Sequence, residues 1–207
     1  MAQVSVKPKP FKLDAGDVAL DFVNTLDDRF SPDGPKELLT SYQDLLRFAQ
    51  QTEVLSAKQA QNLHCAAKAG KALQSAIDLR EVLARIFYGS VEGQAPPLRD
   101  LLRLSEYCKE AGQHRRLCWV HSSFAWQWTD LHREPEAPVW TVAQQASDLL
   151  TSERMAMVRS CGAERCRWLF LDTSKNHSRR WCDMKTCGNR MKARRFQARQ
   201  ATLEESV

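Results

Sequence analysis

No apolar run in the 207-residue chain approaches the roughly 20 residues that a helix needs to cross a bilayer. The first 16 residues carry lysines, but no hydrophobic segment follows them, so they do not resemble a secretory signal. These two absences predict a cytoplasmic protein with no membrane partner. Because cytoplasmic thiols are kept reduced, the seven cysteines need an explanation other than disulfides.

The sequence also lacks the common catalytic motifs. It has no glycine-rich phosphate loop and no G-x-S-x-G nucleophile motif. Four histidines are dispersed and share no metal-ligand spacing with nearby carboxylates: His64, His114, His121 and His132. We therefore do not expect an enzyme. A hydrolase or transferase whose site is assembled from distant residues of the N-terminal region is the alternative.

Positive charge is concentrated toward the C-terminus. Residues 159–199 contain 12 lysines and arginines against 3 acidic residues, a net charge of +9, whereas residues 1–158 have a net charge of −2. The last eight residues add another −2, which leaves +5 for the whole chain. This asymmetry favours an anionic partner for the basic segment, most often nucleic acid. The alternative is a solvated basic surface without such a partner.

Apolar spacing predicts a mainly helical domain over residues 1–158. Ser41 (or Thr40) and Ser56 stand where helix N-caps are expected. Around residues 116–131 the spacing changes to two, and aromatic runs flank the sequence His-Ser-Ser, which predicts a β-hairpin. The expected helices cover residues 17–26, 40–56, 57–67, 68–88, 98–111 and 139–160, with a loop over 27–35.

Four cysteines form two pairs, Cys161 with Cys166 and Cys182 with Cys187, each pair separated by four residues. Two short pairs fifteen residues apart are typical of a structural Zn²⁺ site in a reducing compartment. Four thiolates fill a tetrahedral shell and leave no position for a substrate. The alternative is four isolated buried thiols. His177 ranks lower as a ligand because it falls at the tip of a predicted turn.

The cysteine-rich segment, residues 159–207, predicts a treble-clef-like zinc finger. Residues 168–172 are expected to pair as a strand with residues 179–182, and a helix is expected to start near Cys187. A segment of about 40 residues buries too little surface to fold alone, so metal binding would supply the missing free energy of folding. Three other cysteines are expected in the core of the first domain: Cys65, Cys108 and Cys118.

Arginine dominates the basic residues of the zinc segment, and its planar side chain suits bidentate contacts with phosphates or guanine. We expect the C-terminal helix to rest on the finger through Phe196 and to present its basic side chains to double-stranded DNA. The alternatives are an RNA or protein partner, or arginines that pair with the acidic body. The predicted DNA contacts are Lys175, Arg179, Arg180, Arg190, Lys192, Arg194, Arg195 and Arg199.

Polar residues interrupt two apolar helices of the first domain. Asp21 and Asn24 lie in the first helix, and Arg80 lies in the long helix. Because buried polar groups need partners, the three predict either an internal network or a pocket for a small polar or anionic ligand. The pocket would make this domain a sensor. The tryptophans of and near the hairpin are expected in the core rather than on a stacking surface: Trp119, Trp126, Trp128 and Trp140.

The stretch CGAERCRWLFLDTSKNHSRRWCDMKTCGNRMKARRF resembles the CGNR zinc finger, whose name is spelled by residues 187–190. Upstream, LDFVNTL (20–26) and DLREVLARIF (78–87) resemble signatures of the α-helical ABATE domain. That domain precedes the finger in bacterial transcription regulators linked to stress. The resemblance implies a DNA-binding bacterial regulator with a structural Zn²⁺ and a helical domain that senses a ligand or partner. A dimer is one option for its oligomeric state, since operators are often palindromic.

Overall fold

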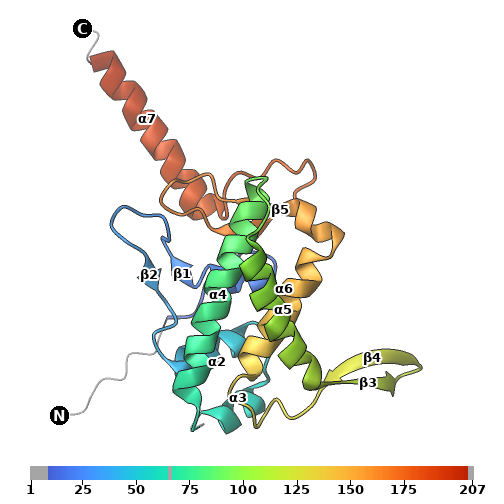
Figure 1. The fold of residues 1–207 in the computed structure, drawn as a ribbon. Helices are drawn as coiled ribbons and strands as arrows, with labels where there is room; N and C mark the ends of the chain where they lie inside the picture. Colours follow the sequence, from blue (N-terminus) through green and yellow to red (C-terminus); the bar gives the residue numbers. More distant parts are fainter. Residues whose placement is uncertain (1–8, 65–66, 205–207) are drawn as a thin grey trace, which may run out of the picture.

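The structure is a computed structural model that describes residues 9–64 and 67–204, except the side chains of Arg195, Ala198, Arg199 and residues 201–204. It is mainly helical with three two-stranded antiparallel sheets, which confirms the predicted fold class. A bundle of helices forms the body, and helix α7 projects from one end of it (Figure 1). No helix in the described ranges is both long and apolar enough to span a bilayer.

Along the chain, helices α1 to α5 are followed by the β3–β4 hairpin, then by helix α6 and then by the finger. The body comprises α1 (Val18–Val23), β1 (Leu26–Asp27), β2 (Lys36–Glu37), α2 (Tyr42–Gln51), α3 (Ala57–Leu63), α4 (Ala69–Val91), α5 (Leu98–Gln113), β3 (Arg115–Val120), β4 (Ser123–Trp128) and α6 (Ala137–Leu150). The remainder comprises a 3₁₀ turn η1 (Glu153–Met157), β5 (Val158–Ser160), β6 (Leu169–Leu171), a π-helical turn η2 (Met184–Gly188) and α7 (Asn189–Glu204).

Helix α4 lies at the centre of the body and is contacted by α1, α2, α5 and α6. Its buried apolar residues recur at intervals of three and four, as expected for a helix that packs along one face. Phe22 of α1 and Phe48 of α2 meet at a ring-centroid distance of 5.4 Å within the same core. The buried apolar side chains of α4 are Ala72, Ala76, Leu79, Val82, Leu83, Ala84, Ile86, Phe87 and Tyr88.

Two helix starts follow directly from their capping residues. Ser41 accepts a hydrogen bond from the backbone N–H of Asp44, whose carboxylate accepts one from the N–H of Ser41. Ser56 and Gln59 form the same reciprocal arrangement at α3. Each arrangement satisfies two backbone N–H groups that have no partner inside the helix. The expected starts of α2 and α3 are thereby confirmed.

Helices α2 and α3 end at Gln51 and Leu63 rather than at residues 56 and 67. Two further predicted helices are also too long. Helix α1 ends at Val23 rather than residue 26, because Asn24 turns its side chain to the backbone of Leu169 and residues 26–27 pair with residues 36–37. Helix α6 ends at Leu150 rather than residue 160, because residues 158–160 form strand β5. In both places pairing with a segment distant in sequence overrides the local helical spacing.

The hairpin of β3 and β4 confirms the predicted turn but not the predicted burial of its aromatic residues. His121 and Ser122 both adopt positive φ angles, 47° and 64°, as in the two-residue turns that suit hairpin twist. Trp140 is buried and Trp128 packs against the core at the base. Trp119 and Trp126 are 64% and 57% exposed, so the expectation that they lie in the core was wrong.

Of the three remaining cysteines, Cys108 and Cys118 are both half-buried. Cys108 is half-buried and packs against the core of the body, with its Sγ 3.6 Å from the carbonyl oxygen of Ala143. Cys118 is half-buried in β3. Cys65 lies outside the described residues.

The strand pairing of the finger also differs from the prediction. Strand β6 pairs with β5, in the register Val158–Leu171, Arg159–Phe170 and Ser160–Leu169, and not with residues 179–182. The bond from the N–H of Cys161 to the carbonyl of Trp168, at 2.8 Å, continues this pairing to the first cysteine. The segment that contains Arg180 instead makes one backbone hydrogen bond to the loop after β5, from Gly162 N–H to Arg180 O at 2.8 Å.

Candidate metal centre and nucleic-acid interface

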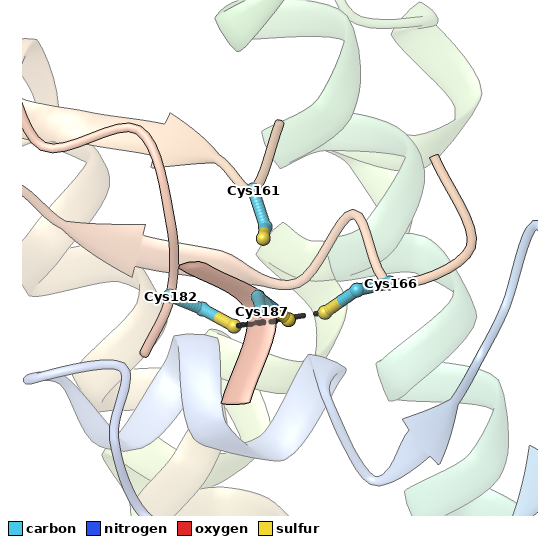
Figure 2. Close-up of side chains that lie close together, drawn as sticks. All are labelled: Cys161, Cys166, Cys182 and Cys187. Carbon is cyan, nitrogen blue, oxygen red and sulfur yellow. Dashed lines mark hydrogen bonds between the residues drawn. The ribbon is translucent and has the colours of Figure 1, made fainter. Parts of the chain in front are cut away.

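The four paired cysteines converge on one point, as Figure 2 shows. Their Sγ atoms all lie within 4.8 Å of one another, and all four residues are buried. The Sγ of Cys182 lies 3.6 Å from that of Cys166 and 3.7 Å from that of Cys187. Thiolates placed tetrahedrally about 2.3 Å from Zn²⁺ would be roughly 3.8 Å apart. The sulfur set therefore fits a structural Zn²⁺ with shifts of no more than about 1 Å.

Three short segments position these sulfurs. Cys161 directly follows β5, and Cys166 follows a tight loop in which Cys166 N–H donates to the carbonyl of Ala163 at 2.9 Å. Cys187 lies in the turn η2, immediately before α7. Hydrogen bonds from the thiols of Cys166 and Cys182 lower the pKa of Cys161 well below the ordinary value of a thiol. The same contacts and burial raise the pKa of Cys166 and Cys182, so without a metal ion the cluster favours a thiolate at Cys161 rather than at either of these.

Two glycines allow the loops to close around the sulfurs. A Cβ at Gly162 would lie 3.1 Å from the ring of Trp181 and 3.2 Å from the carbonyl oxygen of Arg180. A Cβ at Gly188 would lie 2.5 Å from the sulfur of Met184. Both distances are shorter than ordinary van der Waals contact. A larger residue at Gly162 would press on the Arg180 backbone, whereas at Gly188 the exposed Met184 side chain would have to move.

The N-terminal segment holds the turn that carries Cys187. Lys12 Nζ donates to Asp183 Oδ2 at 2.9 Å and to Thr186 Oγ1 at 3.4 Å, and it forms a second ion pair with Asp14 at 2.9 Å. The Lys12 ammonium lowers the pKa of Asp183 below its usual range, and the N–H of Lys185 and hydroxyl of Thr186 add to this effect. Lys12 and Asp183 are 171 positions apart, so local spacing gave no signal of this contact.

The finger is fixed to the body by buried hydrogen bonds. Asn24 Nδ2 donates to the carbonyl of Leu169 at 2.9 Å, and Leu169 N–H donates to Asn24 Oδ1 at 3.0 Å. Trp168 Nε1 donates to Asp27 at 2.8 Å, and the Tyr88 hydroxyl donates to the carbonyl of Arg167 at 3.0 Å. A side-chain amide that matches a backbone N–H and C=O replaces one step of a sheet ladder. Body and finger therefore form a continuous packed unit at this junction.

Asp21, Asn24 and Arg80 do not form one network in the structure. Asp21 Oδ1 accepts a hydrogen bond from the backbone N–H of Ala15 at 3.0 Å, whereas Asn24 pairs with Leu169. Arg80 is 2% exposed and makes two hydrogen bonds to Glu37, at 2.6 and 2.7 Å. Each group is satisfied separately by its own partner.

A cavity of about 560 Å³ lies instead where the body meets the finger. Its walls come from residues 9–12, from the β1–β2 region with the start of α2, and from the finger, including Trp168 and Arg190. Three of the clustered cysteines also line it, so one end of the cavity is the metal centre: Cys166, Cys182 and Cys187. Arg47 Nε, in the same wall, is buried without a hydrogen-bond partner among the described residues. Asp21, Asn24 and Arg80 are not among the residues that line this cavity.

Replacing Asp21 by asparagine is expected to flatten the pH dependence of stability. Burial raises the pKa of Asp21 to about 7, from an ordinary value of 3.8. Between these values the folded protein binds the proton more tightly than the unfolded chain, so the free energy of unfolding falls as pH rises. At pH 7.5 the variant should gain about 1–3 kcal/mol over the parent, measured by urea unfolding of zinc-loaded protein.

The comparison is made as the difference between variant and parent at each pH, because zinc binding adds its own pH dependence to both. Asp130→Asn is the control, since Asp130 is exposed at a positive φ angle that asparagine also adopts. A difference that stays constant from pH 4 to pH 7.5 would show that Asp21 is ionised throughout.

The predicted DNA-contacting residues fall into four groups. Arg179 is part of the scaffold, because it donates to the carbonyls of Trp181 and Cys182 and stacks on Phe170 at 4.5 Å. Arg190 lines the junction cavity on the finger side. The side chains of Arg195 and Arg199 lie outside the described part of the structure. Arg190 is also exposed, as are the remaining four: Lys175, Arg180, Lys192 and Arg194.

Helix α7 is held only at its start. It contacts η2, and its described side chains are exposed beyond Met191. Phe196 is 62% exposed, so the expectation that it rests on the finger was wrong. Figure 1 shows the helix extending away from the body. The described basic side chains of this helix therefore face solvent rather than the core of the body.

Comparison with known families gives two matches along the chain. Residues 16–153 match ABATE, described as "Putative stress-induced transcription regulator". Residues 157–200 match the CGNR zinc finger, and this range contains all four clustered cysteines and most of α7. The first match covers about two-thirds of the 207 residues. A search of curated proteins found no match to the chain.

Proposed function

Since the chain belongs to the ABATE family of stress-induced transcription regulators and carries a CGNR zinc finger, we propose that it binds double-stranded DNA through that finger. The observation that carries the proposal is the exposed basic helix α7, which starts two residues after the buried cysteine Cys187. Zn²⁺ would be held by Cys161, Cys166, Cys182 and Cys187 and would supply folding free energy rather than chemistry.

The dimensions of α7 suit the major groove of DNA. A helix of 16 residues is about 24 Å long, and the major groove is about 12 Å wide and admits a helix. Lys192 and Arg194 are exposed in the first half of α7, and Arg180 and Lys175 are exposed in the loop before η2. Basic groups on both segments suit contacts with phosphates on either side of a groove.

Measurement of duplex affinity at two salt concentrations tests this proposal. If four basic side chains contact phosphates, affinity should fall about 100-fold between roughly 50 and 200 mM salt. Replacing Lys192 and Arg194 by glutamine should weaken binding and reduce the slope of log affinity against log salt by about 2. Fluorescence anisotropy of a labelled duplex with zinc-loaded protein provides both values.

A second double variant tests whether affinity falls because contacts on α7 are lost or because the protein carries less positive charge. Lys58 and Lys109 are exposed on the body helices α3 and α5, so replacing both by glutamine removes the same charge far from α7. This control should retain the parental slope. Equal losses in the two double variants, or binding that does not respond to salt, would contradict a DNA interface on α7.

Exposed Phe196 favours one alternative, a single-stranded nucleic acid whose bases stack on an aromatic ring. The same anisotropy assay with single-stranded RNA and DNA distinguishes the two. Binding to a duplex should be tighter and should survive Phe196→Ala. Preference for a single strand, lost in Phe196→Ala, would assign the helix to that partner instead.

The body would sense a ligand or partner, and we place a ligand in the junction cavity rather than at Asp21, Asn24 and Arg80. The support is the position of the cavity, which is bounded by the body and by Arg190 at the first turn of α7. A bound ligand could thus contact both units at once. Arg47 lines the cavity, so ligand-induced stabilisation that is lost in Arg47→Met identifies the site, and stabilisation retained in that variant rejects it.

A further inference from the structure

The tip of the β3–β4 hairpin carries an apolar face that no residue in the described ranges covers. Leu117 and Trp119 on β3 lie opposite Trp126 and Phe124 on β4, so the four side chains share one face. They are 54%, 64%, 57% and 73% exposed, in that order. Trp119 and Phe124 already contact each other, with ring centroids 4.7 Å apart.

The base of the hairpin is firmly anchored, which fixes the direction of the tip. His114, just before β3, stacks on buried Trp140 with ring centroids 3.7 Å apart. The N–H of Thr129, just after β4, donates to the carbonyl of His114 at 2.8 Å. The hairpin therefore projects as an arm with a fixed base and a free apolar face (Figure 1).

A second apolar patch lies on the outer side of α5. Leu98, Leu101 and Leu102 are 70%, 39% and 57% exposed in its first turns. They sit at the opposite end of α5 from the hairpin, and a 16-residue helix is about 24 Å long. Figure 1 shows the hairpin leaving the C-terminal end of α5 and pointing away from the helix. The arm cannot fold back over these leucines within one chain.

We propose that the chain forms a two-fold dimer in which the hairpin face of each copy packs on the α5 leucines of the other. An isologous arrangement of this kind buries both patches of both copies at once. The hairpin face is defined as Leu117, Trp119, Phe124 and Trp126, and the leucine patch as Leu98, Leu101 and Leu102.

The exposed area is sufficient for a dimer only if both patches take part. From the exposures above, the two patches offer roughly 600 Å² of apolar side-chain surface per copy. Reciprocal packing would bury about 1,200 Å² in total, which is the lower limit for stable interfaces. Packing of the two hairpin faces on each other alone would bury less and fall below that limit.

A lipid surface fits the hairpin less well. Interfacial segments usually combine aromatic residues with lysines or arginines that contact anionic headgroups. The tip from Trp119 to Phe124 contains no lysine or arginine. Arg115 lies at the base of the hairpin, where it contacts the rings of Trp126 and Trp128. A leucine patch on the same chain, by contrast, provides a matching apolar surface.

Sedimentation equilibrium of the full zinc-loaded chain, without DNA, tests the dimer directly. The parent should show a concentration-dependent monomer–dimer equilibrium. Trp126→Glu on the hairpin and Leu102→Glu on α5 should each raise the dimer Kd about 30-fold or more, because each places a charge in a desolvated contact. Gln127→Glu should leave the Kd unchanged, since Gln127 is exposed on the opposite face of the same strand.

All three substituted residues are exposed, so zinc content and thermal unfolding of the monomer should match the parent. A parent that stays monomeric at about 100 µM would overturn the proposal. So would dissociation by Trp126→Glu but not by Leu102→Glu, because hairpins would then pair with each other. Binding of monomer to anionic phospholipid vesicles, lost in Trp126→Glu, would assign the face to a membrane. None of these readouts depends on DNA binding.

Discussion

Replacement of Cys182 by serine is expected to abolish zinc binding and to unfold the finger while the helical body stays folded. Cys182 is buried, and its sulfur lies within 3.7 Å of two other cysteine sulfurs, so no neighbouring residue can take its place. Structural Zn²⁺ supplies about 10–16 kcal/mol to small folds of this kind. Zinc stoichiometry, circular dichroism and duplex binding of the purified variant measure the three consequences.

The body should also become less stable when the finger unfolds. Asn24 and Asp27 would lose Leu169 and Trp168, and the buried amide of Asn24 would have no partner. Cys118→Ser is the matched control, because Cys118 is half-buried in β3 and distant from the cluster along the chain. A Cys182→Ser protein that still holds one Zn²⁺ per chain and binds DNA as the parent does would refute the four-cysteine site.

Replacement of Arg80 by methionine is expected to lower the free energy of unfolding by about 3–5 kcal/mol. The guanidinium is 2% exposed and bonds to both carboxylate oxygens of Glu37, to Glu81 at 2.9 Å and to Thr25 at 3.4 Å. Methionine fills a similar volume but removes the guanidinium from the Glu37 carboxylate, which keeps, among the described residues, only the N–H of Leu39, at 2.8 Å, as a hydrogen-bond partner. Urea unfolding of zinc-loaded protein provides the value.

Arg103→Met serves as the control for Arg80→Met. Arg103 also forms ion pairs, with Asp78 and Glu106 at 2.9 Å, but its side chain is 46% exposed. Exposed pairs contribute less than about 1 kcal/mol, so the control should differ little from the parent. Adding Glu37→Gln to Arg80→Met should recover part of the loss. Equal effects at Arg80 and Arg103 would mean that the buried pair stabilises no more than an exposed one.

Signals confined to a few neighbouring residues predicted the fold well. Ser41 and Ser56 marked helix starts because a capping residue acts on backbone groups two or three positions away. The four cysteines were equally clear, because short pair spacing is itself the requirement of a metal knuckle. His121 and Ser122 marked the turn of a hairpin for the same local reason.

Features that depend on distant segments could not be predicted in this way. Residues 153–160 continue a helical apolar pattern, and only the approach of β6 shows that residues 158–160 are a strand. Arg179 appeared to be one of several free arginines until the fold placed it over Phe170. The exposed face of Trp119 and Trp126 has the same alternation as a buried one, so burial could not be inferred from it.

The rigid junction at Asn24 and Leu169 has a mechanical consequence for α7. Because strand β6 is hydrogen-bonded to the body, the finger has no hinge there, and α7 must follow any reorientation of the helices beneath it. A lever about 24 Å long converts a tilt of roughly 5° at its base into a shift of about 2 Å at its far end. In the proposed DNA complex that shift would exceed the tolerance of a hydrogen bond, so a small strain in the bundle would suffice to separate the arginines from their phosphate acceptors.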